Sequence, residues 1–587
     1  MISWKTVLVM GCCWCMSALA GEIRITPDSS LADAIRQARE MKRTGLATTV
    51  TIHLAPGIYR LYEPIRLRPE DSGLTIEGHG AIVSGGRSIN VWKKQGKFYT
   101  ADIPNFNGRP VDFRQLWVNQ EKAVRARDVV DFEQMNRILT YDKKNRILWV
   151  PKNRIPLTLL KKAAALPEMV LHEMWCTSNL RIKSLTPQGD SVAVRFHDPE
   201  AKIQFEHPWP SPMTPNTGHP SPFYLTNAKE LLDWPGEWYY DFRTQKLWYY
   251  PRDREGFDFG EAFSAIYPVV ETLIEVVGTA DYPVRDITVK GVTFSHTTWM
   301  RPSEKGHVPL QAGMYLTEAY KLRPQIDRPN NHKLDNQGWL GRADAAVELR
   351  YAENAHFEDC RFEHLGGSGL DFVVGCHGGT TTNCTFSDIA MNGLVVGSFS
   401  PEGLETHLPY QPADSREVCS GLTIEQSEFY DISNEDWGCV AIAAGYVSGI
   451  NIEHNTIHDV SYTGISLGWG WNRDSVCMKD NKVHANLIYN YAQHMYDCAG
   501  IYTLGNQPGT MISENVVRDI AKPNYVHNPD HWFYLYTDEG SSNITVRDNW
   551  TPSEKFLQNA NGPGNVWENN GPQVNEQIKR NAGRQKK

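Results

Sequence analysis

The segments "NIEHNTIHDV" at residues 451–460, "KVHANLIYNY" at 482–491 and "MISENVVRDI" at 511–520 repeat one pattern of residue types. Each has an apolar residue at its second position, Asn at its fifth, an apolar residue at its seventh and Asp or Asn at its ninth. A pattern that recurs at a spacing of about 20 to 50 residues is typical of a stacked repeat architecture. The repeat therefore decides the fold, and secondary structure has to be assigned within it.

The same pattern extends through much of the chain. The apolar residue at the seventh position recurs as Phe362, Phe386, Phe429, Ile457, Ile488 and Val517. A single coil of this length has unpaired strand edges and an unburied apolar face, so neighbouring coils must stack. Stacked Asn side chains suit such a turn, because an amide donates to one neighbour and accepts from the other. We predict an all-β fold, a right-handed parallel β-helix; unrelated strands of a sandwich would not repeat one residue class at one offset.

The rest of the chain divides around this repeat. Residues 31–39 alternate as an amphipathic helix behind Ser29 or Ser30, which predicts a helical cap on the first coils within 21–87. From 88 to 270 the coil pattern stops, and Pro-rich turns and aromatic hairpins predict an inserted β-sandwich-like domain. The main β-helix is expected over 271–572, and a disordered tail over 573–587.

The start of the chain predicts export. Lys5, an apolar stretch and small residues at Ala18 and Ala20 form a signal-peptide pattern over residues 1–20, with cleavage after Ala20. A lipid-modified Cys12 is a weaker alternative. No later run approaches the roughly 20 apolar residues that span a bilayer. The mature protein is expected to be periplasmic, secreted or bound to the cell surface.

The amino-acid composition limits the classes of partner that the chain is expected to bind. The chain has 59 Lys and Arg against 68 Asp and Glu, a net charge of −9, which disfavours nucleic acid as a partner. Its 18 Trp and 25 Tyr suit a carbohydrate, which shows an apolar face and a polar edge. The eight cysteines beyond the leader are widely scattered and are expected to be small buried apolar residues. No metal motif or cofactor motif stands out, and we expect a monomer.

Acidic residues recur just ahead of glycines that are expected to open the next strand. The acidic residues are Glu435, Asp436, Asp497, Asp538 and Glu539, and the glycines are Gly438, Gly500 and Gly540. Since neighbouring coils lie about 4.8 Å apart, we expect Asp497 and Asp538 to lie close together on adjacent coils. Asp436 is expected two coils away, at roughly 10 Å.

Two carboxylates at such separations are typical of a glycosidase, where one protonates the leaving oxygen and the other attacks carbon or activates water. Crowded like charges also raise one of the two pKa values, and the adjacent coils favour a retaining mechanism. The competing interpretations are ordinary Asp-Gly turns and calcium binding. Around the pair we expect substrate-binding residues, namely Glu435, Asp436, Trp469, Trp471, His494, Tyr502, His531, Trp532 and Glu539.

Several motifs together resemble glycoside hydrolase family 141. They are "FRQLWVNQEKAVRAR" (113–127), "LDWPGEWYYD" (232–241), "RFEHLGGSGLDF" (361–372), "SLGWGWN" (466–472), "GIYTLG" (500–505) and "YTDEGSS" (536–542). The resemblance covers about residues 22–570. It implies a right-handed parallel β-helix, interrupted by a β-sandwich-like domain, that hydrolyses glycosidic bonds in plant cell-wall glycans. It also implies an α-L-fucosidase or xylanase activity, with Asp497 and Asp538 as the acidic pair.

One departure concerns residues 496–499, Tyr-Asp-Cys-Ala, where a glycine-rich approach to "GIYTLG" is expected. Cys498 and Ala499 are bulkier, so the sugar specificity cannot be carried over from the resemblance. α-L-Fucosidase is the leading specificity, followed by xylanase or xylosidase on pectic or xylan-type glycans. A polysaccharide lyase of the β-helix type and a non-catalytic glycan-binding protein are the alternatives.

Overall fold

The computed structural model describes residues 20–162, 167–207, 210–252, 264–319, 340–399 and 409–585. The predicted signal peptide lies outside these ranges except for its last residue. Five α-helices lie within them: α1 (Leu31–Arg43), α2 (Leu157–Lys162), α3 (Glu200–Glu206), α4 (Arg301–Lys305) and α5 (Gln577–Asn581). No helix in the described part is long and apolar enough to cross a membrane.

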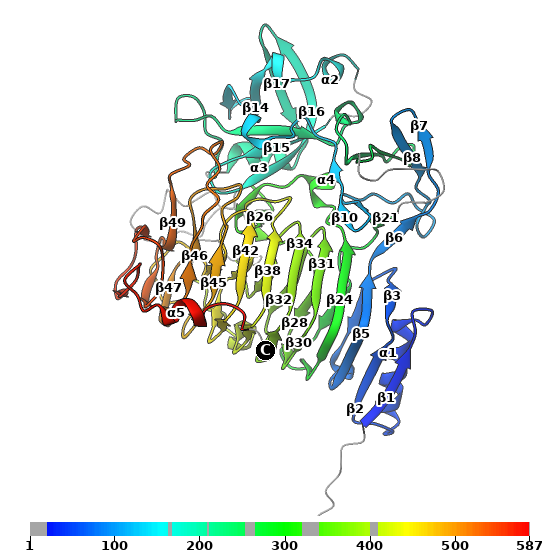
Figure 1. The fold of residues 1–587 in the computed structure, drawn as a ribbon, viewed down its shortest axis with the longest axis vertical. Helices are drawn as coiled ribbons and strands as arrows, with labels where there is room; N and C mark the ends of the chain where they lie inside the picture. Colours follow the sequence, from blue (N-terminus) through cyan, green and yellow to red (C-terminus); the bar gives the residue numbers. More distant parts are fainter. Residues whose placement is uncertain are drawn as a thin grey trace, which may run out of the picture.

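The described strands form a parallel β-helix, which confirms the predicted fold (Figure 1). Its first long sheet, sheet one, contains β1 (Ala20–Ile25), β2 (Thr49–Leu54), β3 (Gly57–Arg60), β5 (Leu74–Ser84), β24 (Thr288–Thr297), β30 (His356–Glu358), β31 (Arg361–Leu365), β33 (Thr380–Thr382), β34 (Thr385–Ile389), β37 (Thr423–Glu425), β38 (Glu428–Ile432), β41 (Asn451–Glu453), β42 (Thr456–Val460), β44 (Lys482–His484), β45 (Leu487–Tyr489), β47 (Asn506–Ser513), β48 (Val516–Val517), β50 (Ser542–Arg547) and β52 (Val566–Glu568).

The second long sheet, sheet two, runs beside the first and carries the site described below. It contains β4 (Ile65–Leu67), β22 (Ile274–Val277), β28 (Ala345–Arg350), β32 (Ser368–Val374), β35 (Leu394–Val396), β39 (Ile442–Ala444), β43 (Ile465–Leu467), β46 (Cys498–Thr503), β49 (Trp532–Thr537) and β51 (Phe556–Gln558). Two short parallel pairs complete the coils, β23 (Val284–Arg285) with β29 (Ala352–Glu353) and β36 (Cys419–Ser420) with β40 (Val447–Ser448).

The repeated residues stack in register inside the solenoid. Phe362, Phe386 and Phe429 pair on successive strands, and their rings are stacked at centroid distances of 4.6 and 4.5 Å. The side-chain amide of Asn455 donates to Asn486 and that of Asn486 to Asn515, each at 3.0 Å. These buried ladders satisfy polar groups and fill the core between coils, as the repeat predicted.

Sequence also explains a left-handed backbone position in six coils, at or near the end of a strand of sheet one. The residues at this position, His364, Asp388, Asp431, Asp459, Asn490 and Asp519, all have positive φ, between 48° and 60°. Asp and Asn tolerate this left-handed conformation better than most other side chains. The recurring Asp or Asn therefore has a backbone role in five of these coils, and His364 takes the position in the sixth.

An inserted domain interrupts the solenoid between two adjacent coils. β5 pairs directly with β24, with Thr75 opposite Thr288, although more than two hundred residues separate them in the chain. The chain leaves after β5 and returns to sheet two at β22, which pairs with β4. The inserted residues lie above the solenoid in Figure 1.

Three mostly antiparallel sheets build the insert, and α2 and α3 lie within it. The first contains β6 (Gly86–Ile89), β9 (Trp117–Val118), β10 (Glu121–Lys122) and β21 (Ala265–Pro268); the second contains β7 (Lys93–Gln95), β8 (Phe98–Asp102), β11 (Val124–Arg125), β19 (Glu237–Asp241) and β20 (Lys246–Tyr249); the third contains β12 (Asn136–Arg137), β13 (Thr140–Asp142), β14 (Ile147–Pro151), β15 (Glu168–His172), β16 (Thr177–Gln188), β17 (Ser191–Phe196) and β18 (Pro222–Thr226). After the insert, β25 (Pro309–Gln311), β26 (Met314–Leu316) and β27 (Leu340–Gly341) form a small sheet beside it.

A buried polar network joins the insert to the solenoid. Nζ of Lys122 lies 3.1 Å from Asp388 and 3.2 Å from Glu435, and Nε1 of Trp117 donates to Asp388 at 2.7 Å. Burial of Asp388 acts in the opposite direction, but Lys122 and His364 hold the pKa of Asp388 well below its usual range. Because Lys122 and Asp388 are both largely desolvated, the contact between them fixes the position of the insert on the solenoid.

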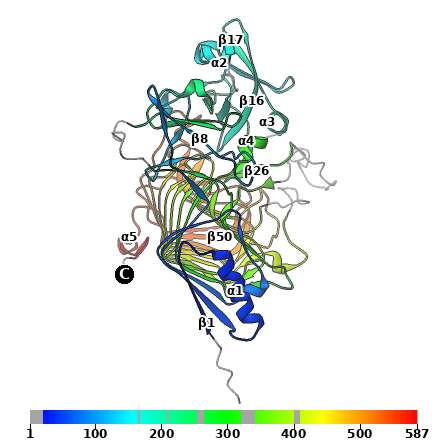
Figure 2. The same cartoon turned by 90° about the vertical axis from the view of Figure 1, so that its right-hand side faces the viewer.

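α1 covers the N-terminal coils of the solenoid, with Ser30 as its N-cap accepting a hydrogen bond from the backbone of Asp33; Figure 2 looks along the stack with α1 at the near end.

The C-terminal segment packs along the side of the solenoid. The predicted disordered tail was wrong for the residues up to 585. There Ile578 of α5 and the flanking residues Val574 and Ala582 pack against Val516.

The eight cysteines beyond the leader are free, and all except Cys477 are buried.

Candidate active site

A pocket of about 420 Å³ lies over sheet two, beneath the insert. Its lining residues are Met174, Trp175, Gln311, Tyr462, Trp471, Asp497, Tyr502, Tyr536, Asp538, Glu539 and Asn559. Five of them were predicted as site residues: Trp471, Asp497, Tyr502, Asp538 and Glu539. The pocket combines carboxylates with aromatic walls, which is the lining expected of a carbohydrate site.

The two aspartates reach the pocket from opposite ends of neighbouring strands. Asp497 immediately precedes β46, and its backbone N–H donates to His531 just ahead of β49. Asp538 follows β49, and its N–H donates to Thr503 at the end of β46. The predicted register was therefore wrong, because Gly540 does not open a strand of sheet two as Gly500 does within β46.

Tyr536 lines the pocket together with both carboxylates. It pairs with Tyr502 on the neighbouring strand, and the two rings meet edge to face at 5.0 Å. Burial raises the pKa of the Tyr536 hydroxyl strongly, and the carboxylates of both Asp497 and Asp538 raise it further. The two carboxylates therefore share one pocket, although their positions along the two strands are far apart.

Asp538 is held as a candidate acid. Tyr502 donates to its Oδ2 at 2.6 Å, and Asn559 donates to its Oδ1 at 2.7 Å. Burial raises the pKa of Asp538 above its ordinary value, and the charge of Asp497 adds to the rise, while the hydrogen bonds from Tyr502 and Asn559 oppose it. A carboxyl group that keeps its proton toward neutral pH can donate it to a leaving oxygen.

Asp497 lies in a different environment. Nε2 of His531 is 3.0 Å from its Oδ1, and this contact raises the pKa of His531. The hydroxyl of Tyr462 donates to the backbone carbonyl of Asp497 at 2.9 Å, and the φ of Asp497 is +53°. A cation beside the carboxylate and a fixed turn suit a nucleophile or a base rather than an acid.

The insert and the small sheet beside it supply part of the wall of the pocket. Met174 and Trp175 come from the turn between β15 and β16, and Gln311 comes from β25. Nε1 of Trp175 donates to the carbonyl of Leu310 at 2.7 Å, which fixes the ring beside Gln311. The site is therefore closed by residues that lie more than 180 positions from either aspartate.

The two tryptophans of "GWGW" differ in role. Trp471 lines the pocket, but Trp469 is only 1 % exposed and packs edge to face against Phe399 at 5.0 Å. The predicted sugar contact of Trp469 was wrong, because the ring is part of the core. Gly468 and Gly470 have φ of +95° and +88°, so backbone conformation explains the glycines that sequence reasoning assigned to a sugar platform.

Glu435 and Asp436 belong to the junction with the insert and not to this pocket. Asp436 is 6 % exposed and bonds to Nε2 of His307 at 2.8 Å and to the hydroxyl of Thr177 at 3.2 Å. Glu435 accepts a hydrogen bond from Gln115 at 2.9 Å. Neither residue lines the pocket of Asp497; both line a smaller cavity at the junction with the insert, and their role in substrate binding stays a prediction.

The other predicted residues lie behind or beside the pocket. His494 stacks on Trp437 at 4.3 Å and contacts the hydroxyl of Tyr525 at 2.6 Å, and burial lowers its pKa to about 3. Trp532 is outside the pocket lining, beneath the ammonium of Lys555 at 3.9 Å. His531 is outside the pocket lining and affects the site through its contact with the carboxylate of Asp497. Cys498 and Ala499, where the sequence departs from the expected glycine-rich pattern, are fully buried and do not line the pocket.

Sequence reasoning missed several lining residues. Tyr462, Trp175, Met174, Gln311 and Asn559 were not identified. Tyr462 and Asn559 lie on coils beside the two aspartates, so a search for polar residues on neighbouring coils could have found them. No sequence signal connects Trp175 or Gln311 to the site, because only the docking of the insert and of the small sheet beside it brings them there.

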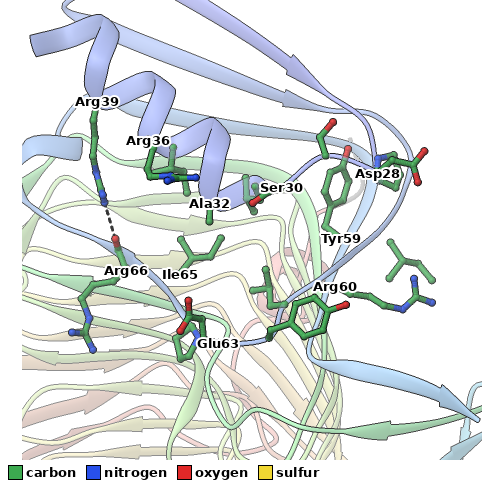
Figure 3. A pocket seen from close by; sticks show the side chains of 18 of the residues that line it. Asp28, Ser30, Ala32, Arg36, Arg39, Tyr59, Arg60, Glu63, Ile65 and Arg66 are labelled. Atoms are coloured by element: carbon green, nitrogen blue, oxygen red, sulfur yellow. Dashed lines mark hydrogen bonds between the residues drawn. The ribbon is translucent and has the colours of Figure 1, made fainter. Parts of the chain in front are cut away.

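A larger pocket of about 680 Å³ lies between α1 and the strands β3 and β4 (Figure 3). Arg39 reaches across it to the carbonyl of Arg66 at 2.9 Å and also binds Asp71. Asp28 and Glu63 are exposed on opposite sides of the pocket, without the burial that tunes a catalytic acid. Size alone therefore does not identify the active site.

Comparisons with known proteins agree with this architecture. A family model described as the GH141 insertion domain matches residues 96–252. A solved structure named "Glycoside hydrolase" is 57 % identical, covers 96 % of this chain and 99 % of its own, and superposes with a TM-score of 0.92. No curated protein matches the chain.

Two remote structures are also similar. XylC in complex with xylose is 12 % identical, with 92 % of this chain and 70 % of that chain covered and a TM-score of 0.44. PfbA, a surface adhesin of Streptococcus pneumoniae, is 11 % identical, with 93 % and 88 % covered and a TM-score of 0.33.

The coiled fold, the acidic pocket and the 57 % identical relative define a glycosidase on a parallel β-helix scaffold. The chain belongs to glycoside hydrolase family 141. Its substrate is accordingly a carbohydrate.

Proposed function

We propose that this glycoside hydrolase is exported and removes a sugar from complex plant cell-wall glycans, with Asp538 as the acid and Asp497 as the nucleophile or base. α-L-Fucosidase is the leading specificity and xylan-type activity the second, both taken from the family resemblance. The observation that carries the assignment of the pair is that Asp497 and Asp538 line one pocket, in which Tyr502 and Asn559 hold the carboxyl group of Asp538.

In the proposed reaction the protonated carboxyl of Asp538 donates its proton to the glycosidic oxygen as the bond from that oxygen to the anomeric carbon breaks. The carboxylate of Asp497 either forms a bond to the anomeric carbon or takes a proton from the water that does so. In the first case Asp538, now ionised, deprotonates the water that releases the sugar from Asp497. Both routes consume one water. The first returns the proton to Asp538 directly, whereas after the second Asp497 holds a proton and Asp538 is ionised, so exchange with solvent restores the starting state.

The remaining lining residues fit binding of one end of a glycan. Pockets of a few hundred Å³ bury small ligands rather than long chains, and Trp175 and Gln311 close this one on the insert side. Trp471, Tyr502 and Tyr536 offer flat apolar faces, and the exposed Glu539 and Asn559 lie at the polar rim. We therefore expect removal of terminal sugars.

The test is release of sugar by the purified mature chain from a panel of nitrophenyl glycosides and defined plant oligosaccharides. Nitrophenyl α-L-fucoside should be hydrolysed fastest, and a xyloside next. Product analysis by proton NMR gives the anomer released first and so decides between retention and inversion. Hydrolysis of neither sugar, with turnover of another, would refute the specificity but not the catalytic pair.

Export has its own test. The full chain, expressed in a bacterial host with its leader, should be recovered outside the cytoplasm with Gly21 as its first residue by intact mass. A cytoplasmic product that retains residues 1–20 would refute the proposed signal peptide. A mass increase from a lipid on Cys12 would support the alternative leader.

A further inference from the structure

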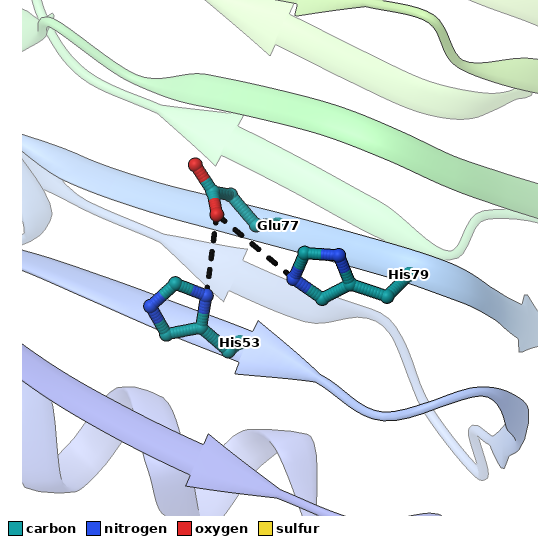
Figure 4. Close-up of side chains that lie close together, drawn as sticks. All are labelled: His53, Glu77 and His79. Atoms are coloured by element: carbon teal, nitrogen blue, oxygen red, sulfur yellow. Dashed lines mark ion pairs between the residues drawn. The ribbon is translucent and has the colours of Figure 1, made fainter.

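Three potential metal ligands gather on the outer face of sheet one, far from the catalytic pocket. His53 lies on β2, and Glu77 and His79 lie on β5, the next strand of the same sheet (Figure 4). His53 and Glu77 are direct register partners, and His79 follows Glu77 by two residues, so all three side chains project from one face. The ring centroids of the two histidines are 5.9 Å apart and nearly parallel.

The geometry of the three donors is compact. Oε2 of Glu77 is 3.2 Å from Nδ1 of His53 and 4.0 Å from Nε2 of His79, and one ligand atom from each residue lies within 4.8 Å of the others. Zn²⁺ binds His nitrogen and carboxylate oxygen at about 2.0–2.2 Å. The three donor atoms would therefore have to move only slightly closer together to surround one ion. Among the residues that the structure describes, this is the one cluster of three such donors.

His53 gives a second, independent observation. Both of its ring nitrogens are buried from solvent, and neither makes a hydrogen bond, since the contact of Nδ1 with Glu77 lacks hydrogen-bond geometry. Buried polar atoms in native proteins normally have a partner. A metal ion bound to one nitrogen would supply that partner.

We propose that His53, Glu77 and His79 form a site for one divalent transition-metal ion, with Zn²⁺ as the expected occupant. Two imidazoles and one carboxylate favour such a metal over Ca²⁺ or Mg²⁺, which prefer oxygen ligands. His79 is exposed, with 58 % of its side chain accessible, which leaves a fourth position for water.

The neighbouring cations do not occupy the carboxylate of Glu77, which leaves it free to bind a metal ion. Arg24 lies opposite His53 on β1, and Lys290 lies opposite Glu77 on β24. Each of these cations has its own carboxylate, because Arg24 pairs with Glu22 at 2.9 Å and Lys290 with Glu358 at 3.3 Å. Glu77 is therefore the carboxylate that faces the two imidazoles.

The proposed ion would connect two strands of the first coils of the solenoid. β2 and β5 lie next to the end of the stack, where coils have fewer neighbours to stabilise them. A ligand that binds only the folded state stabilises it by mass action. The site is thus a stabilising clamp on the N-terminal coils and takes no part in the chemistry at Asp497.

The experiment uses the mature chain without a histidine tag, freed of metal by chelation and titrated with Zn²⁺ by calorimetry. One ion should bind per chain, and His53→Ala or His79→Ala should weaken binding by at least about 100-fold, more than the loss of an outer-shell contact. His356→Ala is the matched control, because His356 lies on the same face and contacts Thr380 at 3.0 Å. It should bind Zn²⁺ as the unaltered chain does.

Two further readouts locate the ion. Co²⁺ in place of Zn²⁺ should give the ligand-field absorption of a four-coordinate site, absent in His79→Ala. Zn²⁺ should slow hydrogen exchange of β2 and β5 amides, with no change at β46 or β49. If no ion binds, or if the two alanine variants bind Zn²⁺ as tightly as His356→Ala, the proposal is wrong. Circular dichroism of the exposed-site variant His79→Ala excludes misfolding as the cause of lost binding.

Discussion

Asp497 and Asp538 line one pocket with Tyr536, although one precedes β46 and the other follows β49, the next strand of the same sheet. The backbone N–H of Asp497 donates to His531, seven positions before Asp538, so the two aspartates are not register partners. The pocket, and not the strand register, therefore brings the two carboxylates to one site. The predictions for Asp497, Asp538 and Tyr502 depend on this arrangement.

Asp497→Asn and Asp538→Asn should each lower kcat by about 10²-fold or more, since an acid or base alone contributes about 10²–10⁴-fold. The two variants should differ with the leaving group. Asp538→Asn should retain more activity on nitrophenyl glycosides, which need little protonation, than on oligosaccharides. Asp519→Asn, which alters an exposed Asp at a left-handed position beside sheet one and outside the pocket lining, is the control and should be fully active. Equal losses on both substrate types would remove the acid role from Asp538.

Tyr502→Phe should move the alkaline limb of the pH–rate profile to higher pH. The hydrogen bond from Tyr502 favours the ionised form of Asp538, so its loss raises the pKa of Asp538 and keeps the acid protonated longer. Asn559→Ala should shift the limb in the same direction, because Asn559 donates to the other oxygen. A shift toward acid in both variants would contradict the assignment.

The contribution of Asp538 to the stability of the folded chain should depend on pH with a defined sign. Burial raises the folded-state pKa of Asp538, so the folded state binds that proton more tightly than the unfolded state. Its contribution is fully present below the unfolded pKa of about 3.9 and is lost as pH rises through the folded value. The melting temperature of Asp538→Asn relative to the unaltered chain should therefore increase from pH 4 to pH 8. A difference in melting temperature that stays constant over this range would show that the pKa of Asp538 is not raised in the folded state.

Lys122→Met should destabilise the junction between the insert and the solenoid. Removal of the ammonium leaves Asp388 and Glu435 largely desolvated without their cation, which costs about 3–5 kcal/mol for a buried pair. Chemical denaturation measures the loss. Lys93→Met, which alters an exposed pair with Asp102, is the control and should change the free energy of unfolding by less than about 1 kcal/mol.

Comparison of Trp469→Ala with Trp471→Ala should distinguish a tryptophan of the core from a tryptophan of the pocket. Trp469 is 1 % exposed, so its truncation should cost about 3–5 kcal/mol of stability. Trp471 lines the pocket, so its truncation should raise KM by about tenfold with a smaller effect on stability, as expected for a lost stacking contact. Thermal melting and steady-state kinetics on both variants make the comparison. An unchanged KM in Trp471→Ala would exclude it from substrate binding.

The sequence by itself determined the solenoid. Apolar anchors such as Phe386 and Phe429, the Asn455 ladder and the left-handed turn at Asp459 recur at fixed offsets because each coil must satisfy the same backbone and burial requirements as its neighbour. These requirements are local and periodic, so they are legible in one chain. The same reasoning identified Asp497 and Asp538, while it misjudged the register that connects them.

Only the tertiary structure decided which side chains share a pocket or a surface. Trp175 and Gln311 line the pocket of Asp497 because the insert and the small sheet that follows it lie over sheet two, and His307 and Thr177 hold Asp436 outside that pocket. His53 and His79 are 26 positions apart, and strand pairing alone makes them neighbours. Contacts between distant segments depend on loop geometry and on docking of the insert, and neither follows a period that the sequence could reveal.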